Sequence, residues 1–412
     1  MDGKAVTVLL GALLCASDAF AQGEIQWYGR VNMDFERVSA MGSTAAAGTP
    51  PVVGGYDKSP RFRVSSNSSY LGIRGSSKIN EDLDAYIQIE SGLNQDTGTA
   101  TTTTSSSTGI SGTFASRNSA LGLQGAMGNL FLGTWETPYR TGFNILDPFG
   151  YTGIGGLALL GNGHTTNPNA GNLISFGRRQ NNSAQYWSPT WEGFNAKFAY
   201  SPNEERPAAA SATAAMPAGY NPSLASVSVT YASERLYGYL GYERHTDYTS
   251  LGNYDNGVNA GAALTVGSVR FGVLYEQLRY RFGGAARNVD AAVNPFVLSG
   301  AVPLAAAGQI RIATWALFST YDVGSSGHLR AAYEHAGDAS GTALNAGAMT
   351  GATKLTLGYG YTLSKQVEVY GVYARIRNHA NGTYDFTTNQ IGTAPTGGGD
   401  PTGMGVGMQY DF

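Results

Sequence analysis

The carboxyl-terminal segment of the chain alternates between two kinds of side chain up to its final residue. In an extended strand, Met404, Val406, Met408, Tyr410 and Phe412 would share one face, and glycine or polar residues would occupy the other. A membrane β-barrel needs such a strand, because its last strand must pair with its first and leave no open edge in lipid. An edge strand of a secreted β-sandwich is the alternative for this segment alone.

The amino-terminal residues have the layout of a secretory signal peptide. Lys4 precedes a short apolar run over residues 6–16, and Ala19 and Ala21 place small residues at the −3 and −1 positions of a cleavage site. We therefore expect residues 1–21 to be removed and residues 22–412 to form the mature protein, as one barrel domain. Asp2 weakens the basic start, so the sequence leaves open whether Met1 is the true initiator.

The composition narrows the class further. Cys15 is the single cysteine, and Leu14 before it disfavours a lipoprotein site, so the mature chain has neither disulfide nor lipid anchor. Charged residues make up 13%, glycine is abundant at 57 residues, and no apolar run reaches the length of a membrane-spanning helix. A net charge of −3 without a basic tract argues against nucleic acid as a partner.

Apolar and polar residues alternate along the whole chain, and the polar face carries charges that the dry core of a soluble protein would not contain. Val269, Phe271, Val273 and Tyr275, for example, alternate with positions that include Arg270 and Glu276. A dry sandwich core cannot hold arginine and glutamate on the inner face of nearly every strand, because burying unpaired charge is costly. A water-filled lumen can, so the pattern favours a transmembrane β-barrel with its apolar face in lipid.

Counting these segments predicts an all-β, sixteen-stranded antiparallel barrel. The expected strands are 25–38, 61–77, 83–94, 114–125, 128–136, 181–189, 193–201, 223–233, 235–247, 257–267, 268–282, 309–322, 326–339, 351–363, 366–379 and 402–412. Short and long connections alternate, as expected for short periplasmic turns on one rim and long extracellular loops on the other. Several tyrosines and tryptophans near strand ends, among them Trp27, Trp187 and Trp191, suit interfacial aromatic girdles.

Several stretches carry a resemblance to a known family. They are residues 70–75, 117–133, 147–150, 179–194 and 363–365, and the most specific is Asn182-Ser183 followed by Tyr186, Ser188-Pro189 and Gly193-Phe194. Together with the two termini, they make the chain similar to the general porins of Gram-negative bacteria, in particular the trimeric porins of β-proteobacteria.

The resemblance implies several properties. A homotrimer in the outer membrane would contact lipid and lipopolysaccharide and pass small hydrophilic solutes and ions. The barrel-assembly machinery would recognise the closing strand through Phe412, Tyr410 and Met408. The third loop, residues 137–180, would fold into the lumen and form the constriction. The implied constriction candidates are Arg30, Arg74, Arg117, Asp147, Arg179 and Glu136.

The charges near this loop predict a weak to moderate anion preference. Arginines outnumber carboxylates there, with Arg30, Arg74, Arg117, Arg140, Arg178 and Arg179 against Asp147 and Glu136. The chain departs from the family pattern at Tyr70 and Thr134, where relatives often carry arginine. A structural alternative is that the arginines pair along the wall with inner-face acids, which are Glu36, Glu90, Glu276 and Glu334.

The sequence offers no sign of catalysis, a metal site or a cofactor. The five histidines lack metal-ligand spacing, and no Gly-x-Ser-x-Gly nucleophile motif is present. A general diffusion channel is therefore the favoured function, and a substrate-specific outer-membrane channel is the main alternative. An adhesin or structural barrel and a soluble β-sandwich lectin are further alternatives, and conductance of the purified protein would separate them.

Overall fold

The computed structural model describes residues 25–43, 57–96, 114–150, 153–163, 176–202, 221–283, 307–344, 349–391 and 397–412. The predicted signal peptide, with Ala19 and Ala21, lies outside these residues. Within the described part of the chain, no helix is both long and apolar enough to cross a membrane.

The described residues form seventeen strand segments in one antiparallel sheet. They are β1 (Ile25–Met41), β2 (Lys58–Ser66), β3 (Tyr70–Asn80), β4 (Leu83–Gly92), β5 (Ser119–Gly125), β6 (Gly128–Glu136), β7 (Arg179–Trp187), β8 (Phe194–Ser201), β9 (Ser223–Ala232), β10 (Leu236–Thr246), β11 (Tyr254–Val266), β12 (Val269–Phe282), β13 (Gly308–Val323), β14 (Gly327–Ala336), β15 (Ala352–Thr362), β16 (Val367–Asn378) and β17 (Asp400–Asp411).

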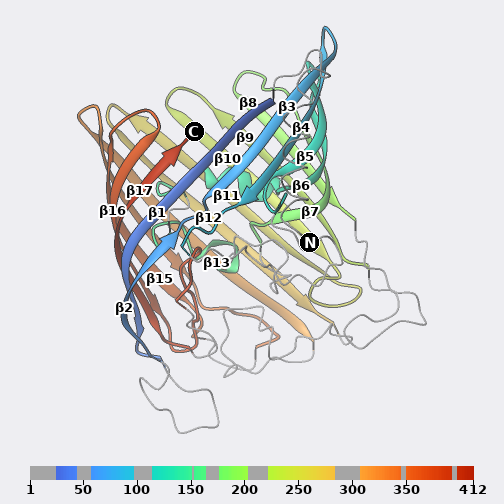
Figure 1. Cartoon of the computed structure of the whole chain (residues 1–412). Coiled ribbons are helices and arrows are strands. Elements are labelled where there is room, and N and C mark those ends of the chain that lie inside the picture. The colour runs from blue at the N-terminus through green and yellow to red at the C-terminus, as the bar shows by residue number, and fades with distance from the viewer. Residues whose placement is uncertain are drawn as a thin grey trace, which may run out of the picture.

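The sheet closes on itself as a sixteen-stranded barrel (Figure 1). One edge of β1 pairs with β17, and the other edge pairs first with β3 and then with β2. β2 and β3 are therefore one barrel strand, interrupted by a bulge at Asn67–Ser69 in which Ser68 has φ 57°. The predicted fold class, strand number and approximate strand positions are confirmed.

The closing contact brings the two ends of the chain together. The backbone N–H of Gly29 donates to the carbonyl of Phe412 at 2.9 Å, and the N–H of Phe412 donates to the carbonyl of Gly29 at 3.0 Å. A β-carbon at Gly29 would lie 2.5 Å from the Phe412 ring, so only glycine leaves the ring its place on the outer surface. The last residue thus extends the β1–β17 ladder to its end.

The two faces of the wall have the predicted inverted polarity. On β12, Phe271, Val273 and Tyr275 are 46–47% exposed on the outside, whereas Glu276 is fully buried on the inside. The prediction for Trp187 was wrong, because its ring packs inside against Phe131 at 5.3 Å and does not join an outer girdle. Trp187 follows the inward Gln185 by two residues, and side chains two positions apart in a strand lie on the same face of the wall.

The two rims differ as predicted. The connections between β3 and β4, β5 and β6, and β11 and β12 are two-residue turns, and with the other short turns they lie at the upper rim in Figure 1. Gly267, in the last of these turns, has φ 57°, a backbone conformation that glycine adopts without strain. The opposite rim carries the long connections, so it is the extracellular rim.

Candidate pore constriction

The third loop enters the barrel directly after β6. Helix α2 (Pro138–Asn144) begins with proline at its first turn, where the missing N–H is not needed, and buries Tyr139 and Phe143. A short 3₁₀ turn, η2 (Leu160–Asn162), follows further along. We call residues 137–150 and 153–163 the third-loop segment. It lies inside the barrel along β8–β13, and Ile154 reaches the inner face of β17.

Two wall glutamates anchor this segment through its backbone. Glu276 accepts from the Tyr139 hydroxyl and from the N–H of Gly161, both at 2.7 Å. Glu334 Oε2 accepts from the N–H groups of Ala158 and Leu159, both at 2.9 Å. These contacts satisfy polar backbone groups that the loop would otherwise bury without partners.

Lys354 completes the anchoring with a charge of the opposite sign. Its Nζ donates to the carbonyls of Gly155 and Gly156 and lies 3.6 Å from Glu334. The lysine is 1% exposed, so the loop and the wall together enclose it. One ion pair on the wall therefore binds both donors and acceptors of the same loop backbone.

Apolar packing adds to these hydrogen bonds. Leu157, Leu159 and Leu160 are at most 2% exposed, although they belong to a loop inside a barrel. Glycines on the wall make room for other loop side chains. A β-carbon at Gly261, Gly358 or Gly403 would lie 2.4–2.8 Å from Leu146, Phe149 or Ile154, respectively. The inner-face glycines thus leave the space in which side chains of the third-loop segment pack against the wall.

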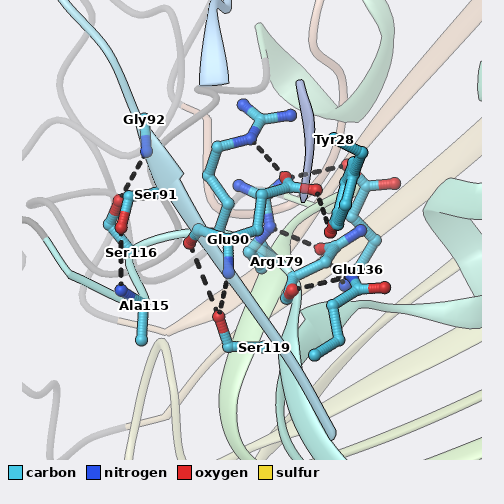
Figure 2. A network of polar contacts seen from close by, with 12 residues as sticks. Tyr28, Glu90, Ser91, Gly92, Ala115, Ser116, Ser119, Glu136 and Arg179 are labelled. Carbon is cyan, nitrogen blue, oxygen red and sulfur yellow. Dashed lines mark hydrogen bonds and ion pairs between the residues drawn. The ribbon is translucent and has the colours of Figure 1, made fainter. Parts of the chain in front are cut away.

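A polar network covers the wall at β4–β7 (Figure 2). Arg117 Nε donates to Glu90 at 2.6 Å, and the Tyr28 hydroxyl donates to the same carboxylate at 3.2 Å. The Arg117 guanidinium also lies 4.8 Å from the centre of the Tyr70 ring. Tyr70, at a position where the resemblance implied arginine, thus supports a neighbouring arginine. The Arg117 side chain is 21% exposed, so part of its charge reaches the lumen.

The second half of this network joins the wall to the third-loop segment. Arg179 Nη2 donates to Glu136 at 3.0 Å, and its Nε donates to Asn118 at 2.7 Å. Glu136 also lies 3.4 Å from Arg140 and accepts from Asn144 at 3.1 Å, both of which belong to the loop. The Arg179 side chain is only 3% exposed, so its charge is largely compensated within the wall.

Two of the remaining candidates lie apart from this network, whereas the guanidinium of Arg74 contacts its edge, 5.3 Å from the centre of the Tyr28 ring. Arg30 pairs with Asp411 at 2.6 Å across the closing seam, and Arg74 donates to Gln26 at 3.1 Å. Asp147 accepts from the backbone N–H groups of Phe149 and Leu157, so it shapes the loop that contains it. The structure therefore brings Arg117, Arg179 and Glu136 together, places Arg74 at the edge of their network, and leaves Arg30 and Asp147 elsewhere on the wall or loop.

The hypothesis of pairing along the wall is only partly right. Glu90 pairs with Arg117, and Glu36 pairs with Arg63 at 2.8 Å. Glu276 and Glu334 instead contact the loop, and Glu334 also contacts Lys354, because the third-loop segment covers their side of the lumen. Sequence reasoning missed these two residues as loop anchors, and their only signal was an acidic residue on an inner face.

The residues that the structure describes contain no group of three or more histidine, cysteine or acidic side chains arranged to hold a metal. The arrangement instead consists of a closed wall, an internal loop and paired charges at the lumen surface.

Comparisons with known proteins agree with this architecture. The outer membrane porin protein 32 of Delftia acidovorans is 24% identical over 99% of this chain and the whole of that protein. The structure of an anion-selective porin from Comamonas acidovorans superposes with a TM-score of 0.66, at 23% identity, over 95% of this chain and all of the other. OmpT of Vibrio cholerae gives a TM-score of 0.57 at 15% identity, over 95% of this chain and 98% of its own.

The family model for Gram-negative porins matches residues 5–381. This match covers most of the barrel, and the fold, the inverted polarity and the internal loop all accord with it. The chain therefore belongs to the Gram-negative porin family and is a protein of the bacterial outer membrane.

Proposed function

We propose that the protein is a general diffusion porin, through which small hydrophilic solutes and ions pass passively with a weak to moderate preference for anions. The observation that carries this proposal is the third-loop segment, anchored inside the barrel by Glu276 and Glu334. A sixteen-stranded barrel is wide enough for an aqueous channel, and an internal loop narrows it. The family and the fold are those of channels and not of enzymes.

The anion preference rests on the charges that remain at the lumen surface. The Arg117 side chain is 21% exposed, whereas that of its partner Glu90 is only 8% exposed. Arg74 is exposed and contacts Gln26 and the Tyr28 ring. Because a narrow channel focuses such charge, the local field favours anions although the whole chain is slightly negative. The name of the anion-selective porin of Comamonas acidovorans agrees with this direction.

Planar-bilayer recordings test this function. In a tenfold salt gradient, the wild-type protein is expected to give a reversal potential of anionic sign that shrinks at high salt, because the Debye length is only about 10 Å at 0.1 M. Arg117→Ser combined with Arg179→Ser should shift this potential toward cations and leave conductance equal or higher. An unchanged potential would mean that the selective charges lie elsewhere.

The same recordings separate the substrate-specific alternative. Saturable block of the current by one solute class at low concentration would favour a dedicated binding channel. A general porin shows current reduction only in proportion to solute size and viscosity. Complete absence of conductance would favour an adhesin or a structural barrel.

Assembly is the second part of the proposal. We expect cleavage after Ala21, recognition of the closing strand by the barrel-assembly machinery through Phe412, Tyr410 and Met408, and a homotrimer in contact with lipid and lipopolysaccharide. One solved structure of OmpT from Vibrio cholerae is described as a trimer form, and it shares this fold. The first five barrel strands, whose outer surface includes Ala85, are the expected subunit contact. Gly29 does not add to this small-residue surface, because the Phe412 ring lies against it.

A further inference from the structure

A cluster of arginines lies on the outer surface of the barrel, at the extracellular rim of β10–β13. Its members are Arg244 on β10, Arg279 and Arg281 on β12, and Arg311 on β13. On each strand they share the parity of the exposed apolar residues, such as Leu240, Tyr275 and Leu317. Since the registers of these strands are unbroken, all four side chains start on the membrane-facing surface and not in the lumen.

The register places like charges beside each other. Arg279 is directly opposite Arg311, and Asn256 links Arg279 to Arg244 in the same row across β10–β13. Like charges directly opposite each other on an antiparallel pair destabilise the sheet. Tyr254 lies on the neighbouring row, and the guanidiniums of Arg244 and Arg281 each lie 4.1 Å from the centre of its ring. The ring therefore holds two more positive charges beside the first pair.

Among the described residues, none of the four arginines forms an ion pair. The Arg279 guanidinium donates to the neutral Gln277 side chain at 3.0 Å. Several arginines elsewhere on the barrel have carboxylate partners, including Arg330, which forms two hydrogen bonds with Glu368 at 2.7 and 2.9 Å. Within the described ranges, the rim cluster thus concentrates positive charge without the direct carboxylate contacts that those arginines have.

The height of the cluster indicates what would neutralise it. The outward residues of β12 are apolar from Val269 to Tyr275, and Gln277 and Arg279 follow toward the extracellular rim. Ten residues of tilted strand separate Val269 from Arg279, which corresponds to about 25 Å of barrel height, the thickness of the apolar band of outer-membrane barrels. The guanidiniums therefore lie at the level of the outer-leaflet headgroups.

We propose that Arg244, Arg279, Arg281 and Arg311 bind the phosphate groups of a phosphorylated glycolipid of the outer leaflet, the diphosphorylated lipid A part of lipopolysaccharide. Guanidinium forks bind phosphate oxygens in pairs, and a phosphate between Arg279 and Arg311 converts their repulsion into two favourable contacts. The Tyr254 ring orients Arg244 and Arg281 toward a second phosphate. Acyl chains of such a lipid would lie on the apolar surface directly below.

Binding of defined lipids to the purified protein tests the proposal. The protein is extracted, freed of lipopolysaccharide in detergent and titrated with diphosphorylated lipid A, using native mass spectrometry to count bound lipid. The wild-type protein should bind diphosphorylated lipid A at least about tenfold more tightly than the dephosphorylated form. Arg279→Gln with Arg311→Gln should remove most of this difference, and the added substitutions Arg244→Gln and Arg281→Gln should abolish it.

A matched control separates this site from general loss of charge. Arg37→Gln with Arg377→Gln removes two outward arginines near the same rim. Arg37 is opposite Met404 and Phe62, and Arg377 is opposite Thr353, so neither faces a like charge in these ladders. This control should keep the wild-type preference, and all variants should keep wild-type heat modifiability and conductance. An equal loss in the control, or equal wild-type binding of both lipids, would overturn the proposal.

Competition with inorganic phosphate distinguishes a phosphate group carried by a lipid from a free phosphate ion as the ligand of the arginines. At 10 mM, inorganic phosphate should not displace bound lipid A, because the headgroup is held together with its acyl chains. Full displacement at this concentration would assign the cluster to free anions and overturn the lipid site. The conductance measurements remain informative in either case, because the cluster is outside the pore.

Discussion

The anchoring of the third-loop segment can be tested by removing its two carboxylates. Glu276→Ala combined with Glu334→Ala eliminates the acceptors of four hydrogen bonds, from Tyr139, Gly161, Ala158 and Leu159. Loss of these anchors should let the segment leave the wall more often. We expect larger current fluctuations in the open channel and a higher mean conductance than in the wild type.

The magnitude follows from the contacts that are lost and kept. A buried donor left without a partner costs about 1–3 kcal/mol, so four such donors weaken loop attachment by about 4–12 kcal/mol. Leu157, Leu159 and Leu160 remain buried and oppose release by about 1.5–3 kcal/mol each. Because the two sums are similar, the double variant should release the stretch around Leu157–Leu160 part of the time, and each single variant should mostly retain it. Leu146, Phe149 and Ile154 still hold the rest of the segment against the wall.

Single-channel recording at fixed voltage measures this effect directly. Asp322→Ala serves as control, because it removes a carboxylate at the periplasmic rim that pairs with His328 and does not contact the loop. The double variant should show the excess fluctuation and the control should not. If the double variant has wild-type noise and conductance while folding normally, apolar packing alone holds the loop and the carboxylates do not anchor it.

Three further predictions concern selectivity, closure and assembly. Arg117→Ser alone should shift the reversal potential toward cations, and Arg179→Ser should shift it less. Because the Arg179 side chain is 3% exposed and paired, its loss should lower the free energy of unfolding by about 3 kcal/mol. Equal shifts of the reversal potential would contradict this order. Deleting Phe412, which pairs with Gly29, should sharply reduce insertion into the outer membrane without blocking export, as fractionation and heat modifiability would show. Crosslinking in mild detergent should yield a trimer, and a stable single subunit would refute it.

The sequence by itself determined the barrel. The alternation of apolar with polar or glycine residues has a period of two and is visible in each strand separately. The residues of Val269–Tyr275 alone therefore reveal which side of β12 faces lipid. The strand count, the two kinds of rim and the long third loop follow from the same local pattern. The interruption at Asn67–Ser69 did not obscure it, because the bulge inserts one residue without ending the barrel strand.

Only the tertiary structure decided which charges meet across the barrel. Glu334 accepts hydrogen bonds from Ala158 and Leu159, about 175 positions earlier in the chain, and alternation shows only that it faces inward. The opposition of Arg279 and Arg311 likewise depends on the register of β12 and β13, which are joined through a long connection. A period of two fixes the face of a side chain, whereas its partner depends on strand register and on the path of the loop inside the barrel.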